Sequence, residues 1–205
     1  MRCSEEKNPS VRGFLIENVV LAYLKLKGLP GHEKSTVPSH VSSFGAGIES
    51  ASFVRDTSNR LYVPLIERYP VVDAVLVTYE YSGKASELVA EAEVEVVDES
   101  SEHRLTAKKH SKAKKPIRRA TSAHVRFIQI KSGGIKLKSE MDLRAMLADG
   151  SAGRALWGGA VPARMKKVRY SVVWIATSAE LAKLRRKSET EEFISLGRID
   201  AKLDK

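Results

Sequence analysis

Residues 70–80, PVVDAVLVTYE, and residues 127–133, FIQIKSG, decide how the fold and its chemistry are interpreted. Val and Ala fill the first stretch as in a buried central strand, yet Asp73 lies inside the run. In the second stretch Gln129 and Lys131 are two residues apart, so a strand directs both to one face. Either these polar groups sit in solvent at strand ends, or they converge on a metal ion.

A strand of buried type that gives one face to a glutamine and a lysine is hard to explain by packing. An unpaired ammonium is costly to bury, and Asp73 is the candidate carboxylate to accompany Lys131. A divalent cation requires hard oxygen ligands, which Asp73 and the amide oxygen of Gln129 supply, with Glu17 acting through water. We expect Mg²⁺, or Mn²⁺, to polarise a scissile phosphate while Lys131 orients the attacking water or neutralises developing charge.

The order of elements predicts an α/β fold with a mixed sheet flanked by helices. Asn8 and Pro9 are helix start signals and Gly28 is a stop signal, so residues 8–28 are expected to form a helix that holds Glu17. Apolar residues on nearly every side indicate a central, largely buried helix. The other expected elements are a short strand ending at Pro64, strands at 71–78, 88–97, 124–131 and 168–177, helices at 139–149 and from Ser178, and connections at 28–47 and 151–167.

Length and composition indicate one globular domain, residues 1–205, because 205 residues with 42% apolar content can bury one substantial core. Lys and Arg number 35 against 25 Asp and Glu, and the net charge of +10 favours a polyanion such as nucleic acid or an anionic membrane surface. No apolar run has the length of a membrane span, and no signal peptide is recognisable. Cys3 is the only cysteine, which excludes an intrachain disulfide and a cysteine-based zinc site.

Two basic segments are candidates for nucleic-acid contact. The first lies within residues 98–123, a polar stretch that turns densely basic and is expected to be a mobile loop. It has no interleaved aromatic residue, so phosphate contact is favoured over base stacking. A solvated charge run, a DNA-backbone arm beside the active site and a nuclear localisation signal all stay open. The second segment precedes the strand expected at 168–177. The candidate nucleic-acid-binding residues are Lys108, Lys109, Lys112, Lys114, Lys115, Arg118 and Arg119 in the first segment and Arg164, Lys166 and Lys167 in the second.

The polar residues resemble the PD-(D/E)XK nuclease superfamily, in which a helix bears Glu, a strand bears Asp, and a later strand bears Glu or Gln, any residue, and Lys. Glu17, Asp73, Gln129 and Lys131 follow that order on the expected element types. The resemblance implies a restriction-endonuclease-like fold and these four as catalytic residues, with Asp73, Gln129 and Glu17 as the metal ligands.

A closer similarity is to the nuclease-like domain of Crinkler effectors and of the retrotransposon hot spot proteins of trypanosomes. It is carried by RGFLIENVVL at 12–21, RLYVPLIERYPVVDAVLV at 60–77 and RFIQIKSG at 126–133. This similarity implies a metal-dependent DNA endonuclease located in the nucleus. RNA as the substrate and pairing of two chains into a homodimer both stay open.

Two features depart from the pattern, and the second of them supports an alternative function. The insertion between the Asp73 strand and the Gln129 strand is far longer than the hairpin of a minimal nuclease, and Gln129 gives the cation one negative charge fewer than Glu. The alternative is a catalytically inactive, nuclease-like DNA-binding or chromatin-associated effector module.

Overall fold

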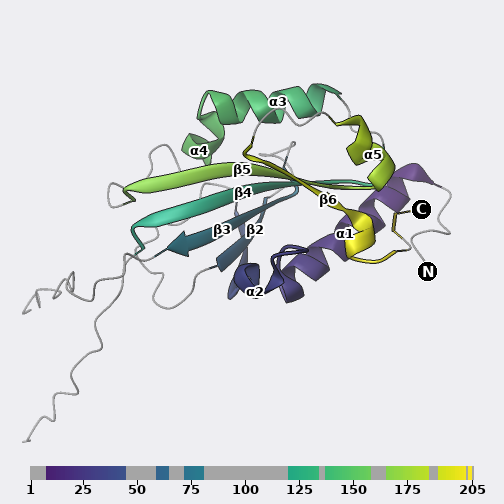
Figure 1. Cartoon of the computed structure of the whole chain (residues 1–205), viewed down its shortest axis with the longest axis horizontal. Helices are drawn as coiled ribbons and strands as arrows, with labels where there is room; N and C mark the ends of the chain where they lie inside the picture. Colours follow the sequence, from purple (N-terminus) through teal and green to yellow (C-terminus); the bar gives the residue numbers. More distant parts are fainter. Residues whose placement is uncertain are drawn as a thin grey trace, which may run out of the picture.

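The fold is an α/β arrangement in which a six-stranded mixed sheet has helices on both faces (Figure 1). The expected mixed sheet flanked by helices is therefore confirmed. The computed structural model describes residues 8–44, 59–64, 72–80, 120–133, 137–157, 165–184, 189–201 and 203–204. The strands are β1 (His40–Phe44), β2 (Asn59–Pro64), β3 (Ala74–Glu80), β4 (Ser122–Lys131), β5 (Lys167–Ala176) and β6 (Glu191–Ser195). The helices are α1 (Pro9–Lys27), α2 (Glu33–Thr36), α3 (Leu137–Ala148), α4 (Ser151–Leu156), α5 (Ser178–Lys183) and the 3₁₀ helix Leu196–Arg198.

The strands lie side by side in chain order, from β1 to β6. β2, β3 and β4 are antiparallel, whereas β1 runs parallel to β2 and the β4–β5–β6 segment is parallel. β4 and β5 pair along their full lengths, from Ser122 opposite Lys167 to Lys131 opposite Ala176. β6 begins opposite Val172, so it borders only the second half of β5.

The two faces of the sheet carry separate hydrophobic clusters because successive strand side chains point to opposite sides. On one face Ile128 and Ile130 of β4 pack with Ile16 and Val20 of α1. On the other face Val125 and Phe127 pack with Leu143 of α3 and with Trp157, which follows α4. Figure 1 shows α3 on one side of the sheet and α1 on the other. Any side chain of β4 can therefore be assigned to a face from its position alone.

Helix α1 begins and ends where the sequence predicts. The Asn8 side chain accepts a hydrogen bond from the Ser10 backbone N–H at 3.0 Å, and Gly28 ends the helix with a φ of 81°. The prediction of a central, largely buried helix is wrong, because α1 packs on one face of the sheet. Phe14 and Leu26 are 65% and 73% exposed on its outer side.

Several expectations from sequence differ from the structure. The expected connections at 28–47 and 151–167 contain α2, β1 and α4, and β6 was not expected. The expected mobile loop at 98–123 runs into β4, which already begins at Ser122, and Thr177 rather than Ser178 caps α5. The expected strand at 88–97 and the segment 98–119 lie outside the described residues.

Candidate active site at one end of strands β3 and β4

Asp73 directly precedes β3 instead of lying inside that strand, which corrects the expectation from sequence. Its backbone N–H donates to the carbonyl of Ile128 at 3.0 Å, and Ala74 is the first residue paired with Ile128. One more step along this antiparallel ladder places Asp73 opposite Gln129. The carboxylate therefore lies at the end of the central strand pair, half-buried.

Gln129 and Lys131 share one face of β4, as their spacing predicts. Ile128 and Ile130 point to the opposite face, where they join the cluster under α1. Gln129 is only 1% exposed, and Lys131 is half-buried at the last position of the strand. The structure thus directs a buried amide and a partly buried ammonium to the side on which Asp73 lies.

Two hydrogen bonds fix the Asp73 carboxylate against β4. Its Oδ2 atom accepts from Gln129 Nε2 at 2.6 Å and from the Ile130 backbone N–H at 2.5 Å. No hydrogen bond from another described residue reaches Oδ1. The Asp73 carboxylate is thus oriented by one of its oxygens and keeps the second available.

The side-chain amide oxygen of Gln129, by contrast, accepts no hydrogen bond from the described residues. Its Oε1 atom is buried and makes no hydrogen bond with any residue that the structure describes. A buried amide oxygen without a partner is destabilising by about 1–3 kcal/mol, and buried polar groups in folded proteins nearly always have one. The amide is oriented through its nitrogen, and its oxygen remains an unused, uncharged acceptor.

The charge of the Asp73 carboxylate is also only partly stabilised by the groups around it. Burial raises the pKa of the Asp73 carboxyl from 3.8 to about 6, against the lowering effects of the Ile130 N–H, the Lys131 ammonium and the Gln129 amide. The negative charge of Glu17 raises this pKa further. Asp73 is therefore a carboxylate that nearby protein groups stabilise only in part, and added positive charge would favour its ionised form.

Glu17 approaches the site from α1, on the other face of the sheet. The helix comes close to the end of β4: a Cβ atom at Gly13 would lie 3.2 Å from Ser132 Oγ, one residue after Lys131. Gly13 and Glu17 are one helical turn apart and lie on the same side of α1. Glu17 is half-buried and has no hydrogen-bond partner among the described residues. Its electrostatic effect on Asp73 fits an outer position better than direct ligation.

The donor set fits a hard divalent cation. Asp73 Oδ1 and Gln129 Oε1 are oxygen atoms that lack hydrogen-bond partners in the described part of the chain, and Gln129 Oε1, like Asn59 Oδ1, is buried. Mg²⁺ and Mn²⁺ bind such carboxylate and amide oxygens and complete their shells with water. Glu17 is near enough to act electrostatically on Asp73. The ligands predicted from sequence are thus brought to one end of the sheet.

The basic residues lie elsewhere. Lys166 and Lys167 are exposed at the start of β5, where Lys167 pairs with Ser122. Gln129 lies seven positions beyond Ser122 in β4, which corresponds to roughly 20 Å along the strand. Glu80 and Ala120, the last and first described residues on either side of 81–119, also lie toward this end of the sheet. The other nucleic-acid candidates, Lys108, Lys109, Lys112, Lys114, Lys115, Arg118, Arg119 and Arg164, lie outside the described residues.

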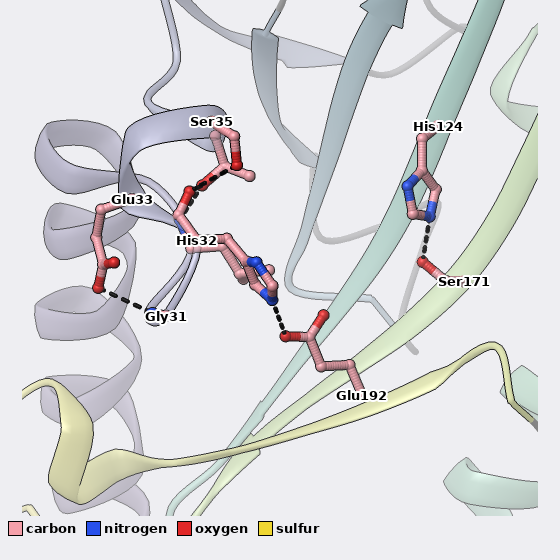
Figure 2. Close-up of polar contacts among 9 residues, drawn as sticks. Gly31, His32, Glu33, Ser35, His124, Ser171 and Glu192 are labelled. Atoms are coloured by element: carbon pink, nitrogen blue, oxygen red, sulfur yellow. Dashed lines mark hydrogen bonds and ion pairs between the residues drawn. The ribbon is translucent and has the colours of Figure 1, made fainter.

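A second group of polar residues, which sequence reasoning did not single out, surrounds a groove of about 750 Å³ at that far end. Figure 2 shows His32, just before α2, directed at Glu192 of β6, and His124 of β4 directed at Ser171 of β5. Both histidine contacts are 2.9 Å. The signal in the sequence was the alternation in HVRFIQIK, where His124 and Arg126 occupy the face opposite to Gln129.

Comparison with known proteins gives no match to a family model, to a curated protein or to a solved structure. Among the described residues, no helix has the length and apolar character needed to cross a membrane. What the chain does must therefore be inferred from the arrangement of its own residues.

Proposed function

We propose that the protein is a metal-dependent DNA endonuclease of the PD-(D/E)XK type with a restriction-endonuclease-like fold. The observation that carries the proposal is the buried Oε1 of Gln129, which has no hydrogen-bond partner among the described residues, on the amide whose nitrogen bonds to Asp73. Lys131 lies on the same face of β4. An acidic oxygen, a neutral oxygen and an ammonium are together what metal-assisted phosphodiester hydrolysis needs.

Each side chain has a distinct role in this reaction. Asp73 Oδ1 and Gln129 Oε1 would hold Mg²⁺, with Glu17 positioning a water molecule from α1. When bound, the ion supplies Lewis-acid polarisation of the scissile phosphate and lowers the pKa of a coordinated water. The Lys131 ammonium, two residues beyond Gln129, orients the attacking water and neutralises charge that develops on the phosphate. The Ile130 N–H keeps the carboxylate in place throughout.

DNA as the substrate and the nucleus as the location rest on two features of the sequence. One is the similarity to nuclease-like domains of nuclear effectors over residues 12–133, and the other is the net charge of +10. A positive protein attracts the phosphate backbone whatever its base sequence, so this attraction favours neither DNA over RNA nor one site over another.

One observation favours the alternative, a nuclease-like DNA-binding module without activity. Asp73 Oδ2 already accepts two hydrogen bonds, and Gln129 brings no negative charge, so the pair forms without any cation. In this case DNA binding would be independent of divalent ions, and Gln129 would serve to hold the ends of β3 and β4 together.

Cleavage of supercoiled plasmid tests the proposal, with Mg²⁺, Mn²⁺, Ca²⁺ or EDTA in parallel. The parent should nick or linearise DNA in Mg²⁺ or Mn²⁺ only, and Lys131→Ala should lower the rate by about a thousandfold or more, as expected for loss of a group that stabilises transition-state charge. Lys25→Ala, which removes an exposed lysine from the last turn of α1, is the matched control and should retain the parental rate. No cleavage by the parent with any ion, while DNA still binds, would favour the inactive module.

A further inference from the structure

The face of the sheet covered by α1 changes character along the strands. Toward the ends of β4 and β5, this face is apolar and packs under α1 through Ile128, Ile130, Val173 and Ile175. Toward their beginnings, the same alternation places polar side chains on that face. These are His124 and Arg126 on β4 and Lys167, Arg169 and Ser171 on β5.

These polar side chains are adjacent across the two strands. His124 is paired with Arg169, and Arg126 with Ser171, in the parallel register. His124, Arg169 and Ser171 line a groove of about 750 Å³, which is also lined by His32 and by the glutamates at 189, 191 and 192. Figure 2 shows His32 and Glu192 in contact, and His124 in contact with Ser171. A cavity of this size holds a small molecule or one segment of a polymer.

Arg126 is a half-buried cation with no ion-pair partner among the described residues. Its single hydrogen bond is from Nη1 to the hydroxyl of Thr78 at 2.9 Å, and no carboxylate of the described residues lies within ion-pairing distance. Burial lowers the pKa of this guanidinium, and the charge of Arg169 also lowers it, while the more distant charges of Glu192 and Glu80 offset part of this effect. A guanidinium has five N–H donors, so an uncharged hydroxyl leaves most of them unused.

Of the glutamates that line the groove, Glu191 pairs with Arg144, and Glu189 is exposed. The carboxylates of Glu192 and Glu80 have partners other than Arg126. Glu192 binds His32 at 2.9 Å, and Glu80 binds Arg169 Nη2 at 2.9 Å as well as the hydroxyl of Ser122. The Glu80–Arg169 pair is about half-exposed on both sides, and exposed pairs of this kind contribute little to stability. Arg169 can therefore leave Glu80 for a stronger anion with little loss.

We propose that Arg126, Arg169 and Ser171 bind a phosphate group at the edge of this groove, where Arg126 lies opposite Ser171. Two guanidinium groups and a hydroxyl supply donors from neighbouring strands of one face, and arginine suits the several oxygens of a phosphate better than a single carboxylate acceptor. Burial and the charges of Arg126 and Arg169 lower the pKa of His124 to about 4, so this histidine adds no charge and completes the wall of the groove as a neutral ring. Lys167 extends the cationic strip toward the rim.

This site is separate from the proposed centre for hydrolysis. It lies on the opposite face of β4, with Arg126 roughly 10 Å along the strand from Gln129, and it needs no metal ion. Lys166 and Lys167, predicted from sequence to contact nucleic acid, lie at the same end of the sheet. The phosphate can come from a nucleic-acid backbone or from free phosphate, and the two sources are distinguished by experiment.

Binding is measured in EDTA, so that failure of cleavage has no bearing on the result. The probes are a fluorescein-labelled 12-nucleotide DNA, single-stranded or duplex, followed by anisotropy, and inorganic phosphate followed by calorimetry. Arg126→Met should weaken binding of the probe by about tenfold, the effect of one charged hydrogen-bond group, and should lower the salt dependence of DNA binding by about one counterion. Glu80→Gln, which releases Arg169, should strengthen binding.

Arg154→Gln is the matched control, because it removes the same charge from an exposed position on α4, and it should bind like the parent. An effect of Arg126→Met on DNA assigns the site to the nucleic-acid backbone, and an effect on inorganic phosphate alone assigns it to free phosphate. If Arg126→Met does not fold, Arg126→Lys keeps the charge without the fork of donors and should weaken binding severalfold. Parental affinity of a folded Arg126 variant for both probes would overturn the proposal.

Discussion

The two ends of strand β4 have opposite deficits. At its end, on the α3 side, Asp73 is a partly compensated anion beside an unpaired amide oxygen of Gln129, so the local need is a cation. In its first half, on the α1 side, Arg126 is a half-buried cation whose only hydrogen-bond partner among the described residues is a hydroxyl, so the local need is an anion. Neither group contributes to the fold as efficiently as an apolar residue could. The comparison suggests that both positions are shaped for ligands.

The largest effect is expected from restoring the negative charge at the cation-seeking end. Gln129→Glu would place a second carboxylate beside Asp73, where Gln129 Nε2 now lies 2.6 Å from Oδ2. Repulsion should destabilise the metal-free protein by about 1–3 kcal/mol, and Mn²⁺ should bind about tenfold more tightly because the ion relieves that repulsion. Urea unfolding with and without Mn²⁺ measures both quantities. Gln129→Leu, which has no oxygen, is the control and should lose Mn²⁺ binding.

Unchanged Mn²⁺ affinity in Gln129→Glu would mean that the amide oxygen does not face an ion. The contact between Asp73 and Gln129 would then be a structural hydrogen bond, and this end of β4 would not be a cation site.

A smaller effect concerns the pH dependence of stability. In the metal-free protein the pKa of Asp73 is about 6 when folded, against 3.8 as its ordinary value, so the folded state holds the proton more tightly. Its contribution to stability is complete below pH 3.8 and is lost as the pH rises through about 6. Asp73→Asn keeps an acceptor oxygen and stays neutral. It should be more stable than the parent at pH 8, by on the order of 2 kcal/mol, and this advantage should fade by pH 4.

Thermal unfolding of both proteins between pH 4 and 8 without divalent ions provides the test. A constant difference across this range would show that Asp73 does not titrate where its burial predicts.

The smallest effect is expected at the anion-seeking end. Arg126→Met removes a desolvated charge that has no ion-pair partner among the described residues and keeps an unbranched side chain of similar length. The free energy of unfolding should stay unchanged or rise by about 1 kcal/mol, since hydrophobic replacements of buried charges are often neutral or stabilising. Chemical denaturation without phosphate measures it. A clear loss of stability would mean that Arg126 stabilises the fold, and Arg126 would then not be shaped for an anionic ligand.

Local signals in the sequence were sufficient for much of the fold. The ends of α1 follow from Asn8 and Gly28, because capping depends on residues within one helical turn. The shared face of Gln129 and Lys131 follows from the two-residue period of a strand. By contrast, the short strands β1 and β6 were missed, because such edge strands are defined by pairing with distant segments and carry weak patterns of their own.

The candidate site was predictable in its members but not in its geometry. Sequence indicated Glu17, Asp73, Gln129 and Lys131, but it placed Asp73 inside β3, whereas pairing begins one residue later. The unpaired Gln129 Oε1 depends on which atom of the amide faces Asp73, and this choice is made by three-dimensional packing. Arg126 was overlooked because a lone arginine in a strand resembles an ordinary exposed charge until its burial and its partners are known.

Titration of the metal-free protein with Mn²⁺ at pH 8, compared between the parent and Asp73→Asn, tests the central claim most directly. The account predicts that the parent binds Mn²⁺ at a single site and that Asp73→Asn, although folded and at least as stable, binds at least about tenfold more weakly because the anionic ligand is gone. Equal binding by the two proteins, or no binding by the parent, would contradict a cation site at Asp73 and Gln129.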